Sequence, residues 1–438
     1  MKPYRLAWRL WWLAGLLLLI CLLGCSGEKN SSGDETTPAA AGGDEPFDDD
    51  FPDRGEGDPI DDDTYVAPPP EPFDPDAPGP YPVGNRTLLL IDENRWDPYL
   101  RSWRPVLVEV WYPTEDWAEN LPRDSLANFL NGWDELILSV FELLGVPPDE
   151  LANLQRETGS ARNAPLRADR APYPVLFFSH GNAAIRFQNF TQCEYLASHG
   201  YVVVAPDHVE NAVFVTYPDD LIIFNPLWMP LSYLDRQKDI HFLVDRFTAL
   251  NRDDPDSFFT GRLAMDKIGV FGHSFGANTA QEVVKWDRRF RAAVAYAGPQ
   301  IPLLPDDFQT PILTMFGMED HTMHDWEFLI RFNYTQRPSP KIMLGFVNGG
   351  HYSFTDACLI VPTLFGAGDG CGTSRRFDTG EEFTFIEHDL AMSLVNTYVT
   401  AWFGLFVKGQ PAMAPYLSAD LHPEEVTYYR DFSAAGGR

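Results

Sequence analysis

Short, continuously apolar segments alternate with longer segments of helical spacing through most of this sequence. The apolar segments are rich in Val, Leu, Ile and Phe and have the length of strands. Strands without a polar face are typical of a parallel sheet that is covered by helices on both faces. The sequence therefore predicts an α/β fold with a mostly parallel central sheet. The expected strands are 87–91, 106–111, 174–179, 201–205, 267–271, 292–296, 311–316 and 341–347, and the expected helices are 187–198, 231–250, 276–285, 323–334 and 385–407.

Residues 116–165 interrupt this alternation. Three helical patterns, at 125–131, 133–144 and 149–156, follow one another with no strand pattern between them. The later stretch 209–230 is irregular. Both are too short to be domains, so we expect one α/β domain over 81–438 with a small helical cap over one edge of the sheet.

The first 25 residues have the pattern of an export signal. A basic start is followed by an apolar run over 10–23, which is short for a membrane span of about 20 residues. The run ends in Leu22-Leu23-Gly24-Cys25. This resembles a bacterial lipobox, in which Cys25 would receive a diacylglyceryl group; a signal anchor with an incidental cysteine is the alternative. The basic residues are Lys2, Arg5 and Arg9.

Segment 26–80 predicts a disordered tether. It contains 17 acidic residues and two basic ones, with many Pro, Gly and Ser. Such a composition cannot bury enough apolar surface to offset the entropy of ordering. Its Asp clusters lack the spacing of a calcium loop. We expect this tether to hold the domain away from a bacterial envelope membrane, in the periplasm or at the cell surface. Because Ser26 follows the cysteine, the outer membrane is favoured.

The acidic balance narrows the range of partners. The chain has 33 basic and 63 acidic residues and a formal charge of −30. Phosphate binding needs clustered Lys and Arg, so nucleic acid is not expected as a partner. Docking on anionic lipid by a basic face is not expected either.

A nucleophile motif follows the strand expected at 267–271. The sequence continues Gly272-His273-Ser274-Phe275-Gly276 and then enters a helix. This G-x-S-x-G pattern between strand and helix places a serine on a sharp turn, with its hydroxyl above the sheet. Glycines at both ends allow strand and helix to approach. The helix N-terminus directs backbone amides at the place where negative charge would develop. We therefore predict that Ser274 is a catalytic nucleophile.

An acid and a histidine follow Ser274 in the order typical of α/β-hydrolases. Asp320 comes just after the strand expected at 311–316, and Glu319 is the alternative acid. His351 stands in a glycine-rich loop after the next strand. In this triad, His351 would take the serine proton and Asp320 would fix the histidine tautomer. An acyl-enzyme would form and then be hydrolysed.

An oxyanion hole needs two backbone N–H donors. Phe275, the residue after the nucleophile, supplies one, and we expect Asn182 in the loop after the strand at 174–179 to supply the other. His180 in that loop and His208 further on are interpreted as structural. A metal site at Asp320-His321-Thr322-Met323-His324-Asp325 is less favoured than the start of a helix. No metal and no cofactor are expected.

Three cysteines remain beyond Cys25. Cys358 and Cys371 lie in one glycine-rich loop just after His351, so we expect a short disulfide between them, as an exported protein can keep. Cys193 lies in a helical pattern and is expected to be a buried free thiol.

Five segments of the sequence carry a family resemblance, namely 79–84, 108–113, 177–181, 196–201 and 272–276. In this order they resemble successive landmarks of platelet-activating-factor acetylhydrolases. The resemblance covers about 79–407. It implies an α/β-hydrolase fold, no cofactor, and hydrolysis of short or oxidised acyl esters of phospholipids. In the animal plasma-type enzymes the acid follows the strand after the nucleophile helix. Here that strand ends in Ala295-Tyr296-Ala297-Gly298, and Asp320 comes one strand later, as in bacterial lipases, dienelactone-hydrolase-like proteins and cutinase-like polyesterases.

These patterns predict a serine esterase or lipase-like hydrolase acting on a small-molecule or lipid ester. Aromatic residues in the cap, namely Phe129, Trp133 and Phe141, could line an acyl pocket, but burial of a helix face is the default interpretation. A peptidase or thioesterase on the same triad, or an inactive hydrolase fold that serves as a binding lipoprotein, are the alternatives.

Overall fold

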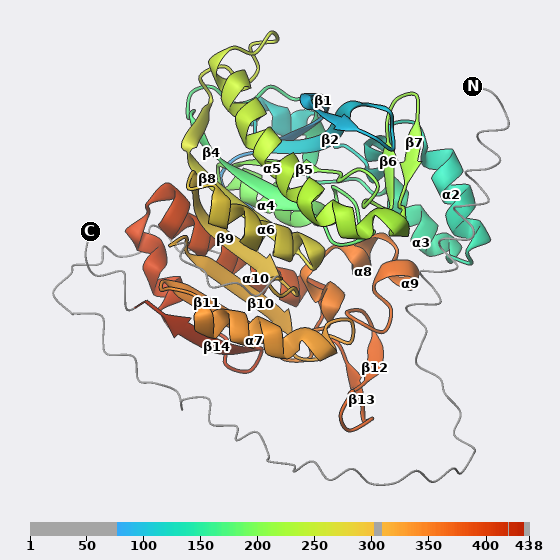
Figure 1. Ribbon diagram of the computed structural model, residues 1–438, viewed down its shortest axis with the longest axis vertical. Coiled ribbons are helices and arrows are strands. Elements are labelled where there is room, and N and C mark those ends of the chain that lie inside the picture. The colour runs from blue at the N-terminus through green and yellow to red at the C-terminus, as the bar shows by residue number, and fades with distance from the viewer. Residues whose placement is uncertain (1–76, 302–308, 419, 433–438) are drawn as a thin grey trace. The chain divides into compact units, whose positions relative to one another are not determined.

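The computed structural model describes residues 77–301, 309–418 and 420–432. The expected export signal, Cys25 and nearly all of the expected tether lie outside these residues. Figure 1 shows a central twisted sheet with helices on both of its faces.

Within the described residues, ten strands form one mixed sheet whose central part is parallel. The strand order is β14-β11-β10-β9-β8-β4-β5-β2-β1-β3. From β11 to β5 all neighbours run parallel, while β2 is antiparallel to both β5 and β1. The sheet confirms the predicted α/β-hydrolase fold. Its strands are β1 (Val83–Asp97), β2 (Ser102–Pro113), β3 (Ser160–Arg162), β4 (Tyr173–Ser179), β5 (Val202–Pro206), β8 (Leu263–His273), β9 (Phe290–Tyr296), β10 (Ile312–Gly317), β11 (Lys341–Phe346) and β14 (Val426–Asp431).

Alternate side chains of each central strand enter separate apolar cores. In β4, Leu176 and Phe178 face one core, and Val175 and Phe177 face the other, because successive residues of a strand point to opposite faces. The first core is covered by α4 (Phe190–Ser198) and α10 (His388–Phe403), and the second by α5 (Met229–Arg252) and α6 (Phe275–Trp286). This two-sided burial explains why the strands lack a polar period. Helix α7 (Glu327–Gln336) packs through Ile330 on Phe316 and Met343.

The insertion at 116–165 is not purely helical, so the expectation of helices without a strand was wrong in part. Its first helical pattern is a 3₁₀ turn, Leu126–Leu130, followed by α2 (Asp134–Leu143) and α3 (Pro148–Ala152). The chain then forms the edge strand β3, which pairs in parallel with the start of β1. Three residues are too few to show a strand period.

Several other short strands were also missed. The stretch expected to be irregular at 209–230 contains the hairpin of β6 (Phe214–Thr216) and β7 (Leu221–Ile223). Strand β14 closes the far edge of the sheet against β11. A second hairpin joins β12 (Thr373–Arg375) to β13 (Glu382–Thr384).

One helical stretch of the described residues, His388–Lys408, is long and apolar enough to cross a membrane. It consists of α10 and the π-helical turn Gly404–Lys408. Most of its apolar side chains are buried against the sheet, including Trp402, whose Nε1 donates to the carbonyl of Ala293. This packing assigns the stretch to the core of the domain.

Candidate active site

Ser274 lies on a sharp turn between β8 and α6. Its backbone has φ 55° and ψ −117°, a conformation that is costly for a residue with a side chain. Its N–H donates to the carbonyl of Tyr296 on the neighbouring strand at 2.8 Å. A Cβ on Gly276 would lie 1.8 Å from the carbonyl oxygen of Ser179, and one on Gly272 would lie 2.3 Å from that of Gly276. The two glycines are therefore needed for this turn, as the sequence predicts.

His351 and Asp320 meet at the carboxyl ends of two adjacent parallel strands. Asp320 follows β10, His351 follows β11, and His351 Nδ1 lies 2.8 Å from Asp320 Oδ2. Both side chains are almost fully buried. Burial of the His351 ring lowers its pKa, but the charge and hydrogen bond of Asp320 outweigh this effect and raise the pKa above 6.5. The structure thus brings together the histidine and the acid that the sequence suggested.

The alternative acid, Glu319, contacts a residue other than His351. The Glu319 carboxylate contacts the guanidinium of Arg376, and its backbone N–H donates to the carbonyl of Gly349. Asp306 and Asp307, which stand nearest to the earlier acid position, lie outside the described residues. Among the described residues, Asp320 is the carboxylate that contacts His351 Nδ1.

His273, the residue before the nucleophile, connects the loop after β4 with the loop of His351. Its Nε2 lies 2.9 Å from the carbonyl oxygen of His351, and its Nδ1 lies 2.8 Å from Gln188 Nε2. Gln188 Oε1 accepts the N–H of Gly181 at 2.8 Å, so its amide nitrogen must face His273. His273 Nδ1 is then an acceptor, and Nε2–H donates to His351. Burial, together with the charge of His351, holds the pKa of His273 well below its usual value, which keeps this ring neutral.

The predicted oxyanion donors lie on the two segments beside Ser274. Phe275 is the first residue of α6, where the backbone N–H has no intrahelical acceptor. In the loop after β4, the N–H of Gly181 is bonded to Gln188 and that of Ala183 to the carbonyl of Asn211. Between them, the Asn182 N–H has no acceptor among the described residues. This arrangement is compatible with Asn182 and Phe275 as the two donors.

Arg236 of α5 binds the end of β4 and the loop that follows it. Its fully buried guanidinium donates to Ser179 Oγ and to the carbonyl oxygen of His180, and it lies over the ring of Phe275. Burial lowers the Arg236 pKa to about 9. No pattern in the sequence indicates a role for Arg236.

The two histidines that were interpreted as structural are fully buried beneath the loop. His208 lies between Ser179 Oγ (2.9 Å) and Asp239 Oδ2 (3.0 Å). His180 Nε2 accepts the backbone N–H of His208 at 3.1 Å. Burial lowers the pKa of both rings, that of His208 to about 3. Both rings are therefore neutral supports, in agreement with the sequence interpretation.

Asp369 is a second carboxylate beside His351 that sequence reasoning missed. Its Oδ1 accepts the backbone N–H of His351 at 2.9 Å and that of His321 at 3.0 Å. Its Oδ2 accepts the N–H and the hydroxyl of Thr322, at 2.8 and 2.6 Å. Asp369 therefore joins the loop of His351 to the loop of Asp320. Burial and the nearby charge of Asp320 raise its pKa.

Cys358 and Cys371 form the expected disulfide, with Cα atoms 5.7 Å apart. The closed loop contains Asp369, two residues before Cys371. Cys193 is a buried free cysteine in α4, also as expected.

The sequence is similar to those of a known family and of individual known proteins. It matches the family described as platelet-activating factor acetylhydrolase, isoform II, over residues 73–249 and 253–369. Platelet-activating factor acetylhydrolase of Cavia porcellus is 23% identical over 322 residues, which cover 66% of this chain and 70% of that protein. The Bos taurus enzyme is 22% identical over 323 residues, covering 66% and 69%.

A solved structure is also similar. The ferulic acid esterase from Streptomyces cinnamoneus superimposes with a TM-score of 0.63 at 26% identity. The match covers 81% of this chain and 98% of that one. The similarity therefore extends over nearly the whole of that chain.

Proposed function

Because the chain belongs to the platelet-activating factor acetylhydrolase isoform II family, we propose that it is a serine hydrolase that cleaves carboxylic esters through an acyl-enzyme. The observation that carries this proposal is the contact of 2.8 Å between His351 Nδ1 and Asp320, in a site that also holds the strained turn of Ser274. Relatives named as an acetylhydrolase and a ferulic acid esterase support ester chemistry.

Each group has one role in this reaction. Asp320 accepts the Nδ1–H of His351, so Nε2 is the lone-pair nitrogen that removes the proton of Ser274. Ser274 Oγ attacks the ester carbonyl, and the oxyanion is held by the N–H groups of Phe275 and Asn182. His351 then gives the proton to the leaving alcohol. Water, activated by the same nitrogen, hydrolyses the acyl-enzyme and frees Ser274.

His273 and Gln188 would hold the loop of the proposed oxyanion donor Asn182 at a fixed position relative to the loop of His351. The chain of bonds from the Gly181 N–H through Gln188 and His273 ends on the His351 carbonyl. A movement of the oxyanion loop is thereby coupled to the histidine loop. Neither side chain needs to change its protonation during the reaction.

The test is labelling with a fluorophosphonate probe together with hydrolysis of p-nitrophenyl acetate. Wild-type protein should be labelled and active, whereas Ser274→Ala should be unlabelled and lose nearly all turnover. Ser139→Ala, at an exposed serine of α2, is the matched control and should behave like the wild type. Near-wild-type turnover in Ser274→Ala would refute the assignment.

The acyl group and the alcohol of the natural ester define a finer level of the proposal. The names of the relatives favour a lipid ester or an aromatic acid ester. Release of acid from a short-acyl phosphatidylcholine, compared with release from a methyl ester of the same acid, measures whether the phospholipid headgroup is recognised. Equal values of kcat/KM would exclude headgroup recognition.

We further propose that Cys25 is lipidated and anchors the domain to a bacterial envelope membrane. The support is the sequence Leu22-Leu23-Gly24-Cys25 after an apolar run. Metabolic labelling with radioactive palmitate should mark the wild type and Cys21→Ser but not Cys25→Ser. Equal labelling of Cys25→Ser would contradict lipidation at this residue.

A further inference from the structure

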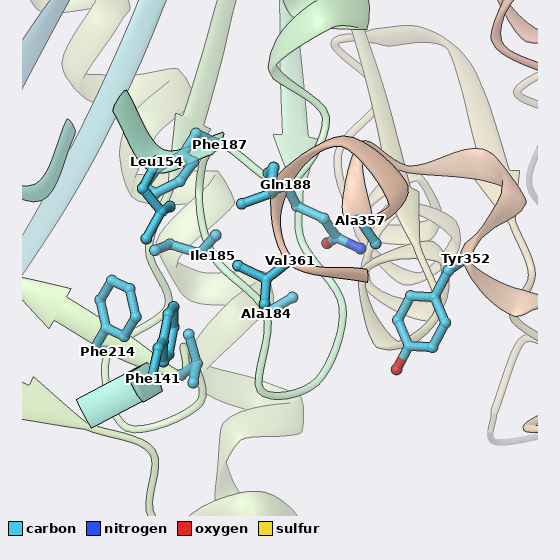
Figure 2. Close-up of a pocket in the computed structure, with 12 residues that line it drawn as sticks. Phe141, Leu154, Ala184, Ile185, Phe187, Gln188, Phe214, Tyr352, Ala357 and Val361 are labelled. Atoms are coloured by element: carbon cyan, nitrogen blue, oxygen red, sulfur yellow. The ribbon is translucent and has the colours of Figure 1, made fainter. Parts of the chain in front are cut away.

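An apolar hollow opens beside the proposed catalytic residues. The empty space in and in front of this hollow is about 550 Å³, part of which is open to solvent. Figure 2 shows side chains from five parts of the chain around it: the cap, the loop after β4, the β6 segment, the turn that begins at His351, and the chain at the start of the disulfide loop. The lining residues are Phe141, Leu154, Ala184, Ile185, Phe187, Gln188, Val213, Phe214, Tyr352, Ala357, Ile360 and Val361.

One end of this hollow lies at the catalytic groups. The Cβ atoms of Ala184 and Ser274 lie 3.7 and 3.5 Å from one point, the position that a Cβ on Gly181 would occupy. Tyr352 follows His351 directly, and their ring centroids are 5.1 Å apart. A group held in the hollow would therefore extend from an ester carbonyl at Ser274.

The other end lies in the cap. Phe141 of α2 and Leu154 contribute side chains from the insertion, and Phe214 comes from β6. In Figure 2 these three lie on the opposite side of the view from Tyr352. Of the aromatic residues suggested by the sequence, Phe141 alone lines the hollow. Phe129 instead stacks on Phe187 in the core, and Trp133 Nε1 donates to the carbonyl of Tyr217.

The hollow offers almost no polar partner to a ligand. Gln188 has both of its side-chain polar atoms engaged, with Gly181 and His273. Apart from the Tyr352 hydroxyl, the remaining lining side chains are hydrocarbon. A polar or charged acyl group would lose its bonds to water there without replacement, whereas a hydrocarbon chain would gain from burial.

We propose that this hollow is the acyl-binding pocket and that it selects unsubstituted hydrocarbon acyl groups longer than acetyl. It discriminates against acyl groups that end in a carboxylate. This proposal rests on the proposed esterase function and adds its substrate class. The cap and the disulfide loop are then specificity elements, since Phe141 and Leu154 come from the first and Ile360 and Val361 from the second.

The first experiment compares three p-nitrophenyl esters with the wild-type protein: acetate, octanoate and the monoester of suberic acid, which has the same chain length as octanoate but ends in a carboxylate. Each buried methylene should raise kcat/KM by up to roughly fourfold. We expect octanoate to exceed both other esters by at least about tenfold. An active enzyme with equal or reversed preferences would overturn the pocket assignment and leave the esterase function intact. A protein that cleaves none of these esters would overturn the function itself.

Two variants test the position of the pocket. Phe141→Ala enlarges its far end and should raise the ratio of laurate to octanoate hydrolysis. Val361→Trp places a larger side chain in the pocket and should lower the ratio of octanoate to acetate hydrolysis at least tenfold. A ratio from one preparation does not depend on the folded fraction. Leu143→Ala, in the same helix as Phe141 but 86% exposed, is the matched control and should leave both ratios unchanged. Unchanged ratios in either folded variant would contradict the proposal.

Hydrolysis of a cinnamate ester distinguishes between two kinds of hydrocarbon acyl group, aryl and aliphatic. If it exceeds octanoate in kcat/KM, the pocket is built for aryl acids, and if octanoate is faster, it is built for aliphatic chains. Either result supports a hydrocarbon pocket, provided that both esters exceed acetate. If both fall below acetate, the proposal is overturned.

Discussion

The backbone N–H of His351 donates a hydrogen bond to Oδ1 of Asp369, at 2.9 Å. The same carboxylate accepts the N–H groups of His321 and Thr322 in the loop that begins with Asp320. Asp369 is therefore a positioning residue for the His351–Asp320 pair. Burial lowers the pKa of His351, whereas Asp320 and, to a smaller extent, the charge of Asp369 raise it.

Asp369→Asn should lower kcat roughly ten- to hundredfold, because an amide cannot accept hydrogen bonds on both sides, and a small displacement of a catalytic group is costly. It should also lower the midpoint of the pH–rate profile, since one of the charges that raise the His351 pKa is removed. A purely structural role would not move this midpoint. Asp378→Asn, at an exposed aspartate, is the control. A midpoint equal to that of the wild type would contradict the positioning role.

The disulfide should stabilise both the domain and the site. Replacing Cys358 and Cys371 by Ser opens a loop with a sequence separation of 13 and should lower the free energy of unfolding by about 3 kcal/mol in the chain-entropy model. Because Asp369 lies in this loop, kcat should also fall. Urea unfolding and ester hydrolysis measure the two effects. Dithiothreitol should reproduce both in the wild type and change nothing in the double variant, and resistance of the wild type would refute the prediction.

The sharp turn at Ser274 and the order of the other proposed catalytic residues could be predicted because they depend on local sequence patterns. An apolar strand, two glycines and a helix place Ser274, and the carboxyl ends of parallel strands place Asp320 and His351. The choice of Asp320 over Glu319 also followed from position. These signals need no knowledge of how distant loops pack.

The supporting contacts depend on such packing, so they escaped prediction. Gln188 and His273 are 85 residues apart in the sequence, and no pattern relates them. Asp369 stood beside the expected disulfide, between Gly368 and Gly370, and that glycine-rich turn was the one available signal. The edge strand β3 has only three residues and β14 is mostly half-exposed, so neither leaves a clear strand period in the sequence.

Ester hydrolysis should depend on the protonation of His351. The neutral ring is the base, so kcat/KM should be low at acid pH and rise with a midpoint above 6.5, because Asp320 raises the pKa of the ring despite its burial. His273 stays neutral over this range and should add no second step. A profile of kcat/KM between pH 5 and 9 measures the midpoint, and a value clearly below 6.5 would contradict the ion pair.

Asp320→Asn tests the acid at the level of single atoms. Asp320 Oδ1 accepts the backbone N–H of Met323 at 2.7 Å, and Oδ2 faces His351 Nδ1. An asparagine that keeps its oxygen on Met323 turns its NH₂ group toward Nδ1, which must then accept. The proton moves to Nε2, the nitrogen that should receive the serine proton. We expect kcat to fall on the order of 10⁴-fold, measured with p-nitrophenyl acetate.

Glu319→Gln is the matched control for this loss, since it removes an adjacent carboxylate of the same loop. Glu319 contacts Arg376 rather than His351, and its side chain points elsewhere because successive residues at a strand end diverge. Its loss should weaken the attachment of the β12–β13 hairpin and reduce kcat by less than about tenfold. If Glu319→Gln instead cost more than Asp320→Asn, the acid would have to be Glu319. The His351 loop would then need to turn in the acyl-enzyme, while Ser274 and His351 would keep their roles.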